Sequence, residues 1–300
     1  MTAVRWETTD IVAGGPGWWS GNSVIDAGVR DGTHLIRKTP REHLGLIVTD
    51  PGAQLRLKVA LDASGLGPAV IELDDVPEGA AGADHAIVME DLRPSHRVAT
   101  LGRLAAPGLV DRVIDAHRAV ADLQLDLPTL NIFDELRRLQ AVVAAEGSSA
   151  PADSAAIEAA VASLEATLPA DQLVASLGDA TAGNHLIADD GESISLVGGT
   201  LACVLDRRHL AGILLAEFGW FCGDPHDIVE RALGSTDADD FRSAVRYSLL
   251  EDLRWGYISR IATARNADDS FVSSLYGMWR VRRAMFTMSQ PGFDDWRRAA

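Results

Sequence analysis

Two short segments near the start of the chain mix apolar and polar residues in strand-like runs, at residues 23–29 (SVIDAGV) and 33–39 (THLIRKT). Runs of this length that are bounded by turn residues are typical of strands. An Asp-Gly pair at residues 31–32 lies between the two segments and favours a tight turn. We therefore predict a β-hairpin here.

A helix and two further strands are predicted after the hairpin. Asp50 and Pro51 form a helix-entry signal, and Gly65 ends the segment that follows them. Residues 69–73 (AVIEL) and 85–92 (HAIVMEDL) are short apolar runs of the kind that form strands. The expected order is strand, strand, helix, strand, strand.

Helical periodicity dominates from residue 102 onward. In residues 107–124 the apolar positions recur every three or four residues, which places one stripe, including His117, in the core. The polar break at residues 147–154 is expected to be an exposed loop. Further helical patterns lie at residues 132–147, 155–168, 208–221, 237–264 and 269–288. A strand-rich part followed by a helical part predicts an α+β fold.

Composition narrows the classes of protein that the chain can belong to. It has 300 residues, enough for a large core, and a net charge of −16, which disfavours a nucleic-acid partner. Small molecules or a basic peptide or protein fit this charge better. No apolar run reaches the length of a membrane span and the first residues lack a signal-peptide pattern, so we expect a cytoplasmic protein with no membrane partner. Cys203 and Cys222 are expected to be free thiols.

Residues 177–200 (LGDATAGNHLIADDGESISLVGGT) hold the main candidates for chemistry. Asp179 and Asn184 lie five residues apart in a glycine-flanked loop, and two apolar runs after them predict a hairpin. An isolated Asp-Asn pair can simply cap its own backbone. A loop of this kind between a helix and a hairpin, behind a strand-rich lobe, is typical of kinase-like phosphotransferases.

Residues 178–184, Gly-Asp-x4-Asn, resemble the catalytic loop of the aminoglycoside phosphotransferase and choline kinase superfamily, except that Leu177 replaces a histidine. The resemblance extends over most of the chain. It implies a two-lobed protein-kinase-like fold, with a nucleotide-binding N-lobe at residues 1–98 and a helical C-lobe at residues 99–300. It also implies that Asp179 is the catalytic base and that Asn184 binds a metal ion or shapes the loop.

The same resemblance implies ATP or GTP as cofactor and assigns residues to its phosphates. Arg37 lies where the family has a phosphate-contacting lysine or arginine, and Lys38 is its neighbour on the opposite strand face. A solvated basic strand end is the simpler alternative. The partner glutamate of that cation aligns with Gln54, which can accept a hydrogen bond but cannot form an ion pair.

Two further segments correspond to nucleotide contacts in the family. Residues 14–23 (GGPGWWSGNS), with Gly21, occupy the position of the loop that covers the phosphates. Residues 88–92 (VMEDL), with Glu90 and Leu92, resemble the hinge whose backbone contacts the base. An ordinary strand end would have the same sequence appearance.

The metal site departs most from the family pattern. The metal-binding aspartate of the family aligns with Gly198, and the acidic residue after it aligns with Thr200. Loss of this carboxylate removes a principal Mg²⁺ ligand, so a Mg²⁺ cofactor is doubtful. The remaining candidates for a substitute ligand are Asp206, Asp189 and Asp190, of which the last two are better explained as the tip of the hairpin.

Other polar clusters have simpler explanations. Residues 223–227 (GDPHD) are expected to cap a helix rather than line an acceptor pocket. Residues 251–255 (EDLRW) are expected to form a solvated charged face rather than a substrate contact.

Three hypotheses for function stay open at this point. The first is a nucleotide-dependent phosphotransferase that acts on a hydroxyl of a small metabolite or a peptide. The second is a pseudokinase that serves as a binding or scaffold subunit of a biosynthetic complex. The changes at Leu177, Gln54 and Gly198 favour the second, whereas Asp179 and Asn184 favour the first. The third is a kinase-fold enzyme with different chemistry, which no residue specifies.

Overall fold

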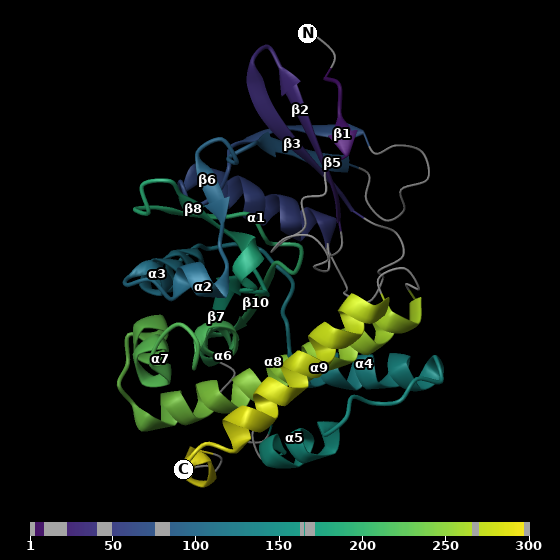
Figure 1. Cartoon of the computed structure of the whole chain (residues 1–300), viewed down its shortest axis with the longest axis vertical. Coiled ribbons are helices and arrows are strands. Elements are labelled where there is room, and N and C mark those ends of the chain that lie inside the picture. Colours follow the sequence, from purple (N-terminus) through teal and green to yellow (C-terminus); the bar gives the residue numbers. More distant parts are fainter. Residues whose placement is uncertain are drawn as a thin grey trace.

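The computed structural model describes residues 4–8, 23–40, 50–75, 85–162, 165, 172–265 and 270–296. Figure 1 shows a strand-rich N-terminal part above a helical C-terminal part. The predicted α+β class is confirmed. A boundary between lobes at residue 98 stays a prediction.

The N-terminal part contains a five-stranded antiparallel sheet in the order β1-β2-β3-β5-β4. Its strands are β1 (Glu7–Thr8), β2 (Ser23–Arg30), β3 (Thr33–Pro40), β4 (Val70–Asp75) and β5 (His85–Glu90). The predicted hairpin is confirmed, because β2 and β3 pair from Arg30 and Thr33 outward. Asp31 (φ 51°) and Gly32 (φ 84°) have the left-handed backbone that its two-residue turn requires.

Helix α1 (Pro51–Ala63) lies beneath this sheet in Figure 1. It begins directly after Asp50 and ends before Gly65 (φ 69°), as the sequence predicts. Its buried residues recur every three or four positions, at Ala53, Gln54, Leu57, Lys58 and Leu61. One glutamine and one lysine therefore lie on an otherwise apolar helix face.

Two small sheets lie at the junction of the two parts. The predicted hairpin after the Asp-Asn loop is confirmed as β8 (His185–Ala188) and β9 (Ile194–Leu196), and β6 (His96–Val98) pairs with β8. The second sheet pairs β7 (Leu173–Ser176) with β10 (Cys203–Asp206). The loop from residue 177 to 184 thus leaves one sheet and enters the other.

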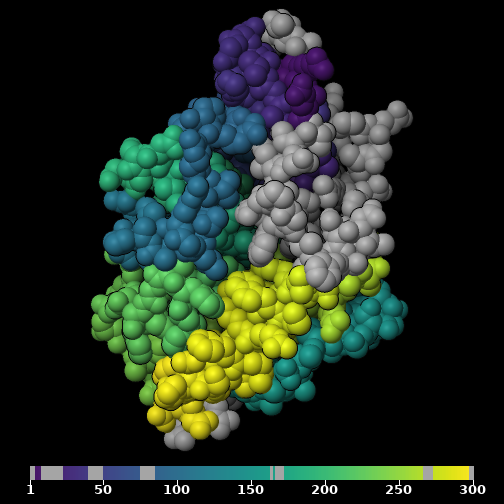
Figure 2. All heavy atoms as spheres, in the orientation of Figure 1, coloured from purple at the N-terminus to yellow at the C-terminus, as the bar shows by residue number. Residues whose placement is uncertain are grey.

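Helices form the C-terminal part, and α8 and α9 run side by side across it (Figure 1). In Figure 2 the yellow atoms of α9 and α10 cover much of its front face. Among the described helices, none is long and apolar enough to cross a membrane. The helices are α2 (Leu101–Leu104), α3 (Leu109–Ala121), α4 (Ile132–Ala145), α5 (Ser154–Val161), α6 (Arg207–Phe218), α7 (Pro225–Leu233), α8 (Ala238–Arg265), α9 (Ser270–Met288) and α10 (Phe293–Trp296).

Helices α6 and α8 approach each other closely at Gly212. A Cβ atom at this position would lie 2.5 Å from the Tyr247 Cβ and 3.0 Å from the Ala244 carbonyl oxygen. Contacts this short require one helix to move, and both helices are buried along most of their length. A glycine at residue 212 is therefore required by this packing.

We expect Gly212→Ala to lower the free energy of unfolding by about 2 kcal/mol or more, because the added methyl group collides with the backbone of α8. Gly102→Ala in α2 is the control, since a Cβ there meets nothing within 4 Å and alanine favours a helix by about 1 kcal/mol. Urea denaturation of both variants measures the difference. Equal effects would contradict close packing of α6 on α8.

Candidate functional site

The Asp-Asn loop is held in place from behind by α8. Gly178 has φ 70°, and any side chain there would collide with the backbone of Leu201. The Arg254 Nη1 donates a hydrogen bond to the Gly178 carbonyl oxygen at 3.3 Å. The chain can therefore take this path only with glycine at residue 178, and α8 fixes the start of the loop.

The loop brings Asp179 and Asn184 into direct contact. The Asp179 Oδ2 accepts a hydrogen bond from the Asn184 Nδ2 at 2.7 Å. The Asp179 Oδ1 accepts from the backbone N–H of Thr181 at 2.8 Å and from its hydroxyl at 2.6 Å. Three donors thus fix the orientation of the carboxylate, and only its Oδ2, which accepts one hydrogen bond, has a second lone pair to offer.

The environment of Asp179 favours its protonated form more than water does. Burial raises the pKa of the Asp179 carboxyl above its ordinary value, and the negative charge of Glu217 acts in the same direction. The hydrogen bonds from Thr181 and the charge of Arg280 oppose this shift in pKa. A carboxylate with a raised pKa is a better general base than one at the surface.

The structure does not bring Arg37 to this loop. Its guanidinium pairs with the Asp26 carboxylate at 2.9 Å and the Asp74 carboxylate at 3.3 Å, and it lies over the Trp6 ring. Asp26 is the direct cross-strand partner of Arg37, so both side chains lie on the same face of the sheet. A phosphate contact by Arg37 stays a prediction, and in this structure its charge is paired with these two carboxylates.

Lys38 is the cation that faces the loop region. Its Nζ donates a hydrogen bond to the Thr200 Oγ1 at 3.0 Å. Burial lowers the pKa of Lys38 to about 8, and the nearby Asp179 carboxylate partly opposes this shift. Thr200 is the position where the resemblance places an acidic residue, so a hydroxyl here takes the place of a carboxylate.

A second lysine, Lys58, was not expected at this site. It lies on α1 one turn after Gln54, is 1% exposed, and donates a hydrogen bond from its Nζ to the Val197 carbonyl oxygen at 2.7 Å. Burial and the positive charge of Lys38 both lower the pKa of Lys58 well below its ordinary value. Gln54 is also buried on this face, at 5% exposure.

The composition of the chain could have pointed to Lys58 as a candidate site residue. Of its 27 basic residues, only Lys38 and Lys58 are lysines, and all the others are arginines. The two are far apart in the sequence but contact the same short segment, residues 197–200.

The place of the metal-binding aspartate is filled by another side chain. A Cβ atom at Gly198 would lie 2.7 Å from the Asn184 Cγ and 2.9 Å from its Cβ. Unlike Gly199 (φ 109°), Gly198 does not have a left-handed backbone, so the obstacle to a side chain here is steric. Asn184 therefore occupies the space that an aspartate at residue 198 would need.

The described residues offer a Mg²⁺ ion few ligands. Within them, no group of three or more His, Cys, Asp or Glu side chains could hold a metal ion. Asp189 pairs with Arg97, Asp190 accepts a hydrogen bond from the Glu192 N–H at the hairpin tip, and Asp206 caps α6. None of the three substitutes for the missing carboxylate.

Backbone hydrogen bonds hold the end of β5 and the residues that follow it. The Glu90 N–H donates to the Ala69 carbonyl oxygen at 2.9 Å, and its side chain is exposed. The Leu92 carbonyl oxygen accepts from the Ser95 N–H at 3.0 Å. A nucleotide-base contact by Glu90 and Leu92 stays a prediction, and Gly21 lies outside the described residues.

Residues 251–255 do not form a solvated face, which corrects that expectation. Arg280 and Arg283 on α9 pair with Asp252 on α8, and Arg280 also pairs with Glu217 on α6. All four side chains are at most 5% exposed. Charged residues in a row usually indicate a face that water solvates. Here the charges of α8 are instead paired with charged side chains on neighbouring helices.

The two histidine-containing segments have the simpler roles that the sequence favours. His117 is 1% exposed, and its Nε2 lies 2.9 Å from the His185 Nε2. Asp224 caps α7 by accepting a hydrogen bond from the His226 N–H at 2.8 Å.

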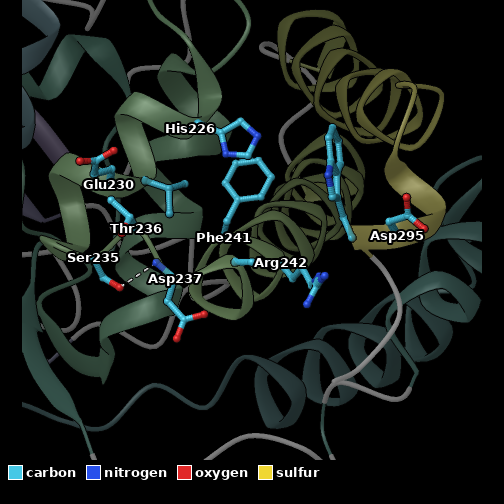
Figure 3. A pocket seen from close by; sticks show the side chains of 11 residues that line it. His226, Glu230, Ser235, Thr236, Asp237, Phe241, Arg242 and Asp295 are labelled. Atoms are coloured by element: carbon cyan, nitrogen blue, oxygen red, sulfur yellow. Dashed lines mark hydrogen bonds between the residues drawn. The ribbon is translucent and has the colours of Figure 1, made fainter.

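A pocket of about 430 Å³ lies among α7, α8 and α10 (Figure 3). In it the His226 ring stacks on the Phe241 ring, with centroids 3.7 Å apart. Its walls include none of the residues of the Asp-Asn loop, and no lysine. It is therefore separate from the candidate site.

We expect Gly198→Ala to lower the free energy of unfolding by about 2 kcal/mol, because the new methyl group displaces Asn184 from Asp179. In an Asn184→Ala background the space is empty, and the same change should cost less than about 1 kcal/mol. A double-mutant cycle by urea denaturation measures this coupling. Additive effects would show that Asn184 does not fill the space beside Gly198.

We also expect Lys38 to make stability depend on pH. Its pKa is about 8 in the folded protein and near the ordinary 10.5 in the unfolded chain. Between these values the unfolded chain binds more protons, so the contribution of Lys38 to the free energy of unfolding rises with pH. This rise should be absent in Lys38→Met. Urea midpoints of both proteins at about pH 7 and about pH 9.5 test this, and parallel pH dependences would contradict it.

Known proteins share the fold but not a recognisable sequence. No protein-family model and no curated protein matches the chain. Among solved structures, it is similar to a choline/ethanolamine kinase family protein from Mesorhizobium loti, with a TM-score of 0.74 and 17% identity over 98% of this chain and 91% of that one.

Two further structures widen this comparison. The choline kinase LicA from Streptococcus pneumoniae has a TM-score of 0.65 and 15% identity, over 88% of this chain and 89% of that one. A spectinomycin phosphotransferase in complex with ADP and spectinomycin has a TM-score of 0.59 and 14% identity, over 96% of this chain and 93% of that one. The chain therefore has the protein-kinase-like fold of the choline/ethanolamine kinases and aminoglycoside phosphotransferases.

Proposed function

We propose that the chain is a nucleotide-dependent phosphotransferase that acts on a hydroxyl of a small metabolite or a peptide. The observation that carries the proposal is the placement of a half-buried carboxylate, an amide and a lysine at one site in this fold. Asp179 and Asn184 are in contact, and the Asp179 charge acts on Lys38. These are the groups that phosphoryl transfer needs for positioning and for charge stabilisation.

The ligand that fits these groups is ATP or GTP. Structures that share the fold include LicA in complex with AMP and an aminoglycoside 2'-phosphotransferase in complex with GDP. In this chain Lys38 would contact the phosphates, and the backbone of residues 90–92 would contact the base. The net charge of −16 favours a neutral or cationic acceptor and disfavours nucleic acid.

Asp179 would receive the proton of the acceptor hydroxyl as that oxygen forms its bond to phosphorus. The bond from phosphorus to the bridging oxygen breaks, and the nucleoside diphosphate leaves with the electron pair. Lys38 would stabilise the negative charge of this leaving group. Asn184 would hold the Asp179 carboxylate in the orientation that accepts the proton.

A binding or scaffold subunit without turnover is the second candidate. It is favoured by the packing of Asn184 into the space of the family's metal-binding aspartate. Such a subunit would bind a nucleotide, or a protein partner, without transferring phosphate. Nucleotide binding without transfer to any acceptor would favour it over the first candidate.

We expect Asp179→Asn to reduce phosphoryl transfer at least about 100-fold and to leave the nucleotide-dependent thermal shift intact, because an amide cannot accept the proton. Transfer from γ-labelled ATP or GTP to choline, ethanolamine and spectinomycin provides the assay. In the unmodified protein the rate should fall as pH drops through the raised pKa of Asp179, above the ordinary 3.8 of an aspartate. Asp122→Asn, which changes an exposed carboxylate after α3, is the control.

Transfer that survives Asp179→Asn would remove this residue from the role of base. Absence of any thermal shift with ATP or GTP, with or without Mg²⁺, would contradict the proposed nucleotide dependence.

A further inference from the structure

The only two lysines of the chain meet at one short segment. Lys38 comes from the sheet and Lys58 from α1, and they donate to the Thr200 hydroxyl and the Val197 carbonyl oxygen. Each basic residue elsewhere in the sequence is an arginine. Residues 197–200 include the position where the family has its metal-binding aspartate.

Neither ammonium group has a carboxylate partner within ion-pair distance in the described part of the chain. The neighbouring Arg37 differs from the lysines in this respect, because its guanidinium forms ion pairs with Asp26 and Asp74. Lys38 lies close enough to Lys58 to lower its pKa, and the Asp179 carboxylate is the negative charge that acts on Lys38. Two neighbouring ammonium groups in such a place are costly to keep protonated unless an anion neutralises them.

The two glycines at residues 198–199 make room for this arrangement. A Cβ at Gly199 would lie 2.8 Å from the Leu57 Cδ2 and 3.9 Å from the Lys58 Cε. A Cβ at Gly198 would collide with Asn184. The absence of a side chain at Gly199 lets α1 approach the segment, where the Lys58 Nζ donates to the Val197 carbonyl oxygen.

We infer that Lys58 is a second phosphate-binding cation and that Lys38 and Lys58 together bind the polyphosphate of a nucleotide without a divalent metal ion. This inference rests on the proposed function only for the nucleotide, since the phosphate chemistry comes from the two lysines. An ammonium group has three donors and Lys58 uses one of them on Val197 in the described contacts. The remaining donors can bind phosphate oxygens, which ammonium groups hold by charge-assisted hydrogen bonds.

The charge balance supports a metal-free ligand. In the family pattern, a metal ion supplies positive charge and is held by an aspartate, and a glutamate pairs with the lysine. Here Gly198 and Gln54 replace both carboxylates, and Lys58 adds one positive charge. The site lacks the two carboxylates that would attract a metal ion. It has an additional ammonium group, which can neutralise phosphate charge as a metal ion would.

The test is isothermal titration of ATP and of inorganic tripolyphosphate in EDTA and in Mg²⁺. We expect both ligands to bind in EDTA, and Lys58→Met to weaken this binding at least about tenfold, the loss expected for one charge-assisted hydrogen bond. Arg5→Met is the matched control, because it removes one positive charge from an exposed N-terminal position. It should change the affinity less than about twofold.

A second measurement follows ligand binding in the unmodified protein. Protein labelled with ¹³C at the lysine Cε should show two side-chain signals, since the chain has two lysines. Both should shift when tripolyphosphate is added in EDTA, and the spectra of Lys38→Met and Lys58→Met assign them. A shift of the Lys38 signal alone would overturn the role of Lys58.

The outcomes separate this inference from the proposed function. ATP binding that requires Mg²⁺ would overturn the inference and leave the proposed phosphotransferase standing. Tripolyphosphate binding in EDTA that depends on Lys58, with no phosphoryl transfer to any acceptor, would support the inference and count against the phosphotransferase. An equal effect of Lys58→Met and Arg5→Met would overturn it, because the loss would then reflect net charge alone.

Discussion

The packing of Asn184 against Gly198 determines the geometry of the candidate site. With no Cβ at residue 198, the Asn184 amide can reach the Asp179 carboxylate and fix its orientation. A carboxylate at residue 198 would have to displace this amide and would place a second negative charge near Asp179, whose pKa burial already raises. The next residue, Gly199, lets α1 approach, since a Cβ there would lie 2.8 Å from the Leu57 Cδ2. Two adjacent glycines therefore leave room for the amide that holds the base and for the helix that carries Lys58.

The charged residues on the two sides of the Asp-Asn loop differ in whether they form ion pairs. Below the loop, Glu217, Asp252, Arg280 and Arg283 form a compact network in which every charge has a partner of opposite sign. Such a network can be stable in the folded protein because its charges compensate each other. On the other side of the loop, Lys38 and Lys58 form no ion pair among the described residues, although Glu72 and Asp74 in the sheet that carries Lys38 pair with arginines. An uncompensated pair beside a fully paired network favours a role in binding an anion over a role in stability.

Much of the fold follows from local sequence patterns, and the failures have identifiable causes. The β2-β3 hairpin, α1 and the long helices were predicted because their periodicity extends over many residues, whereas β6, β7 and β10 have only three or four residues each. The alternation of strand residues correctly predicts that Arg37 and Lys38 lie on opposite faces of the sheet. It does not predict which of the two faces lies toward the Asp-Asn loop. The hairpin register did contain the answer, since a two-residue turn at 31–32 places Asp26 opposite Arg37. The buried charges at residues 251–255 could not be predicted locally, because their partners lie on α6 and α9.

The use of lysine at this site, in a chain whose other basic residues are arginines, has a physical reason. A guanidinium is planar and wide, and it keeps its charge at any ordinary pH, so it suits paired positions such as the contacts of Arg37 and Arg283 with carboxylates. An ammonium is a compact point charge that can lose its proton when it is buried, so two of them can share a small space in the absence of ligand. Burial lowers the pKa of Lys38 to about 8 and that of Lys58 well below its ordinary value, so the empty site need not hold two full positive charges. A phosphate ligand reverses this balance, because its negative charge favours the protonated form of both lysines. Proton uptake would then accompany phosphate binding, a coupling that two arginines in the same positions could not provide.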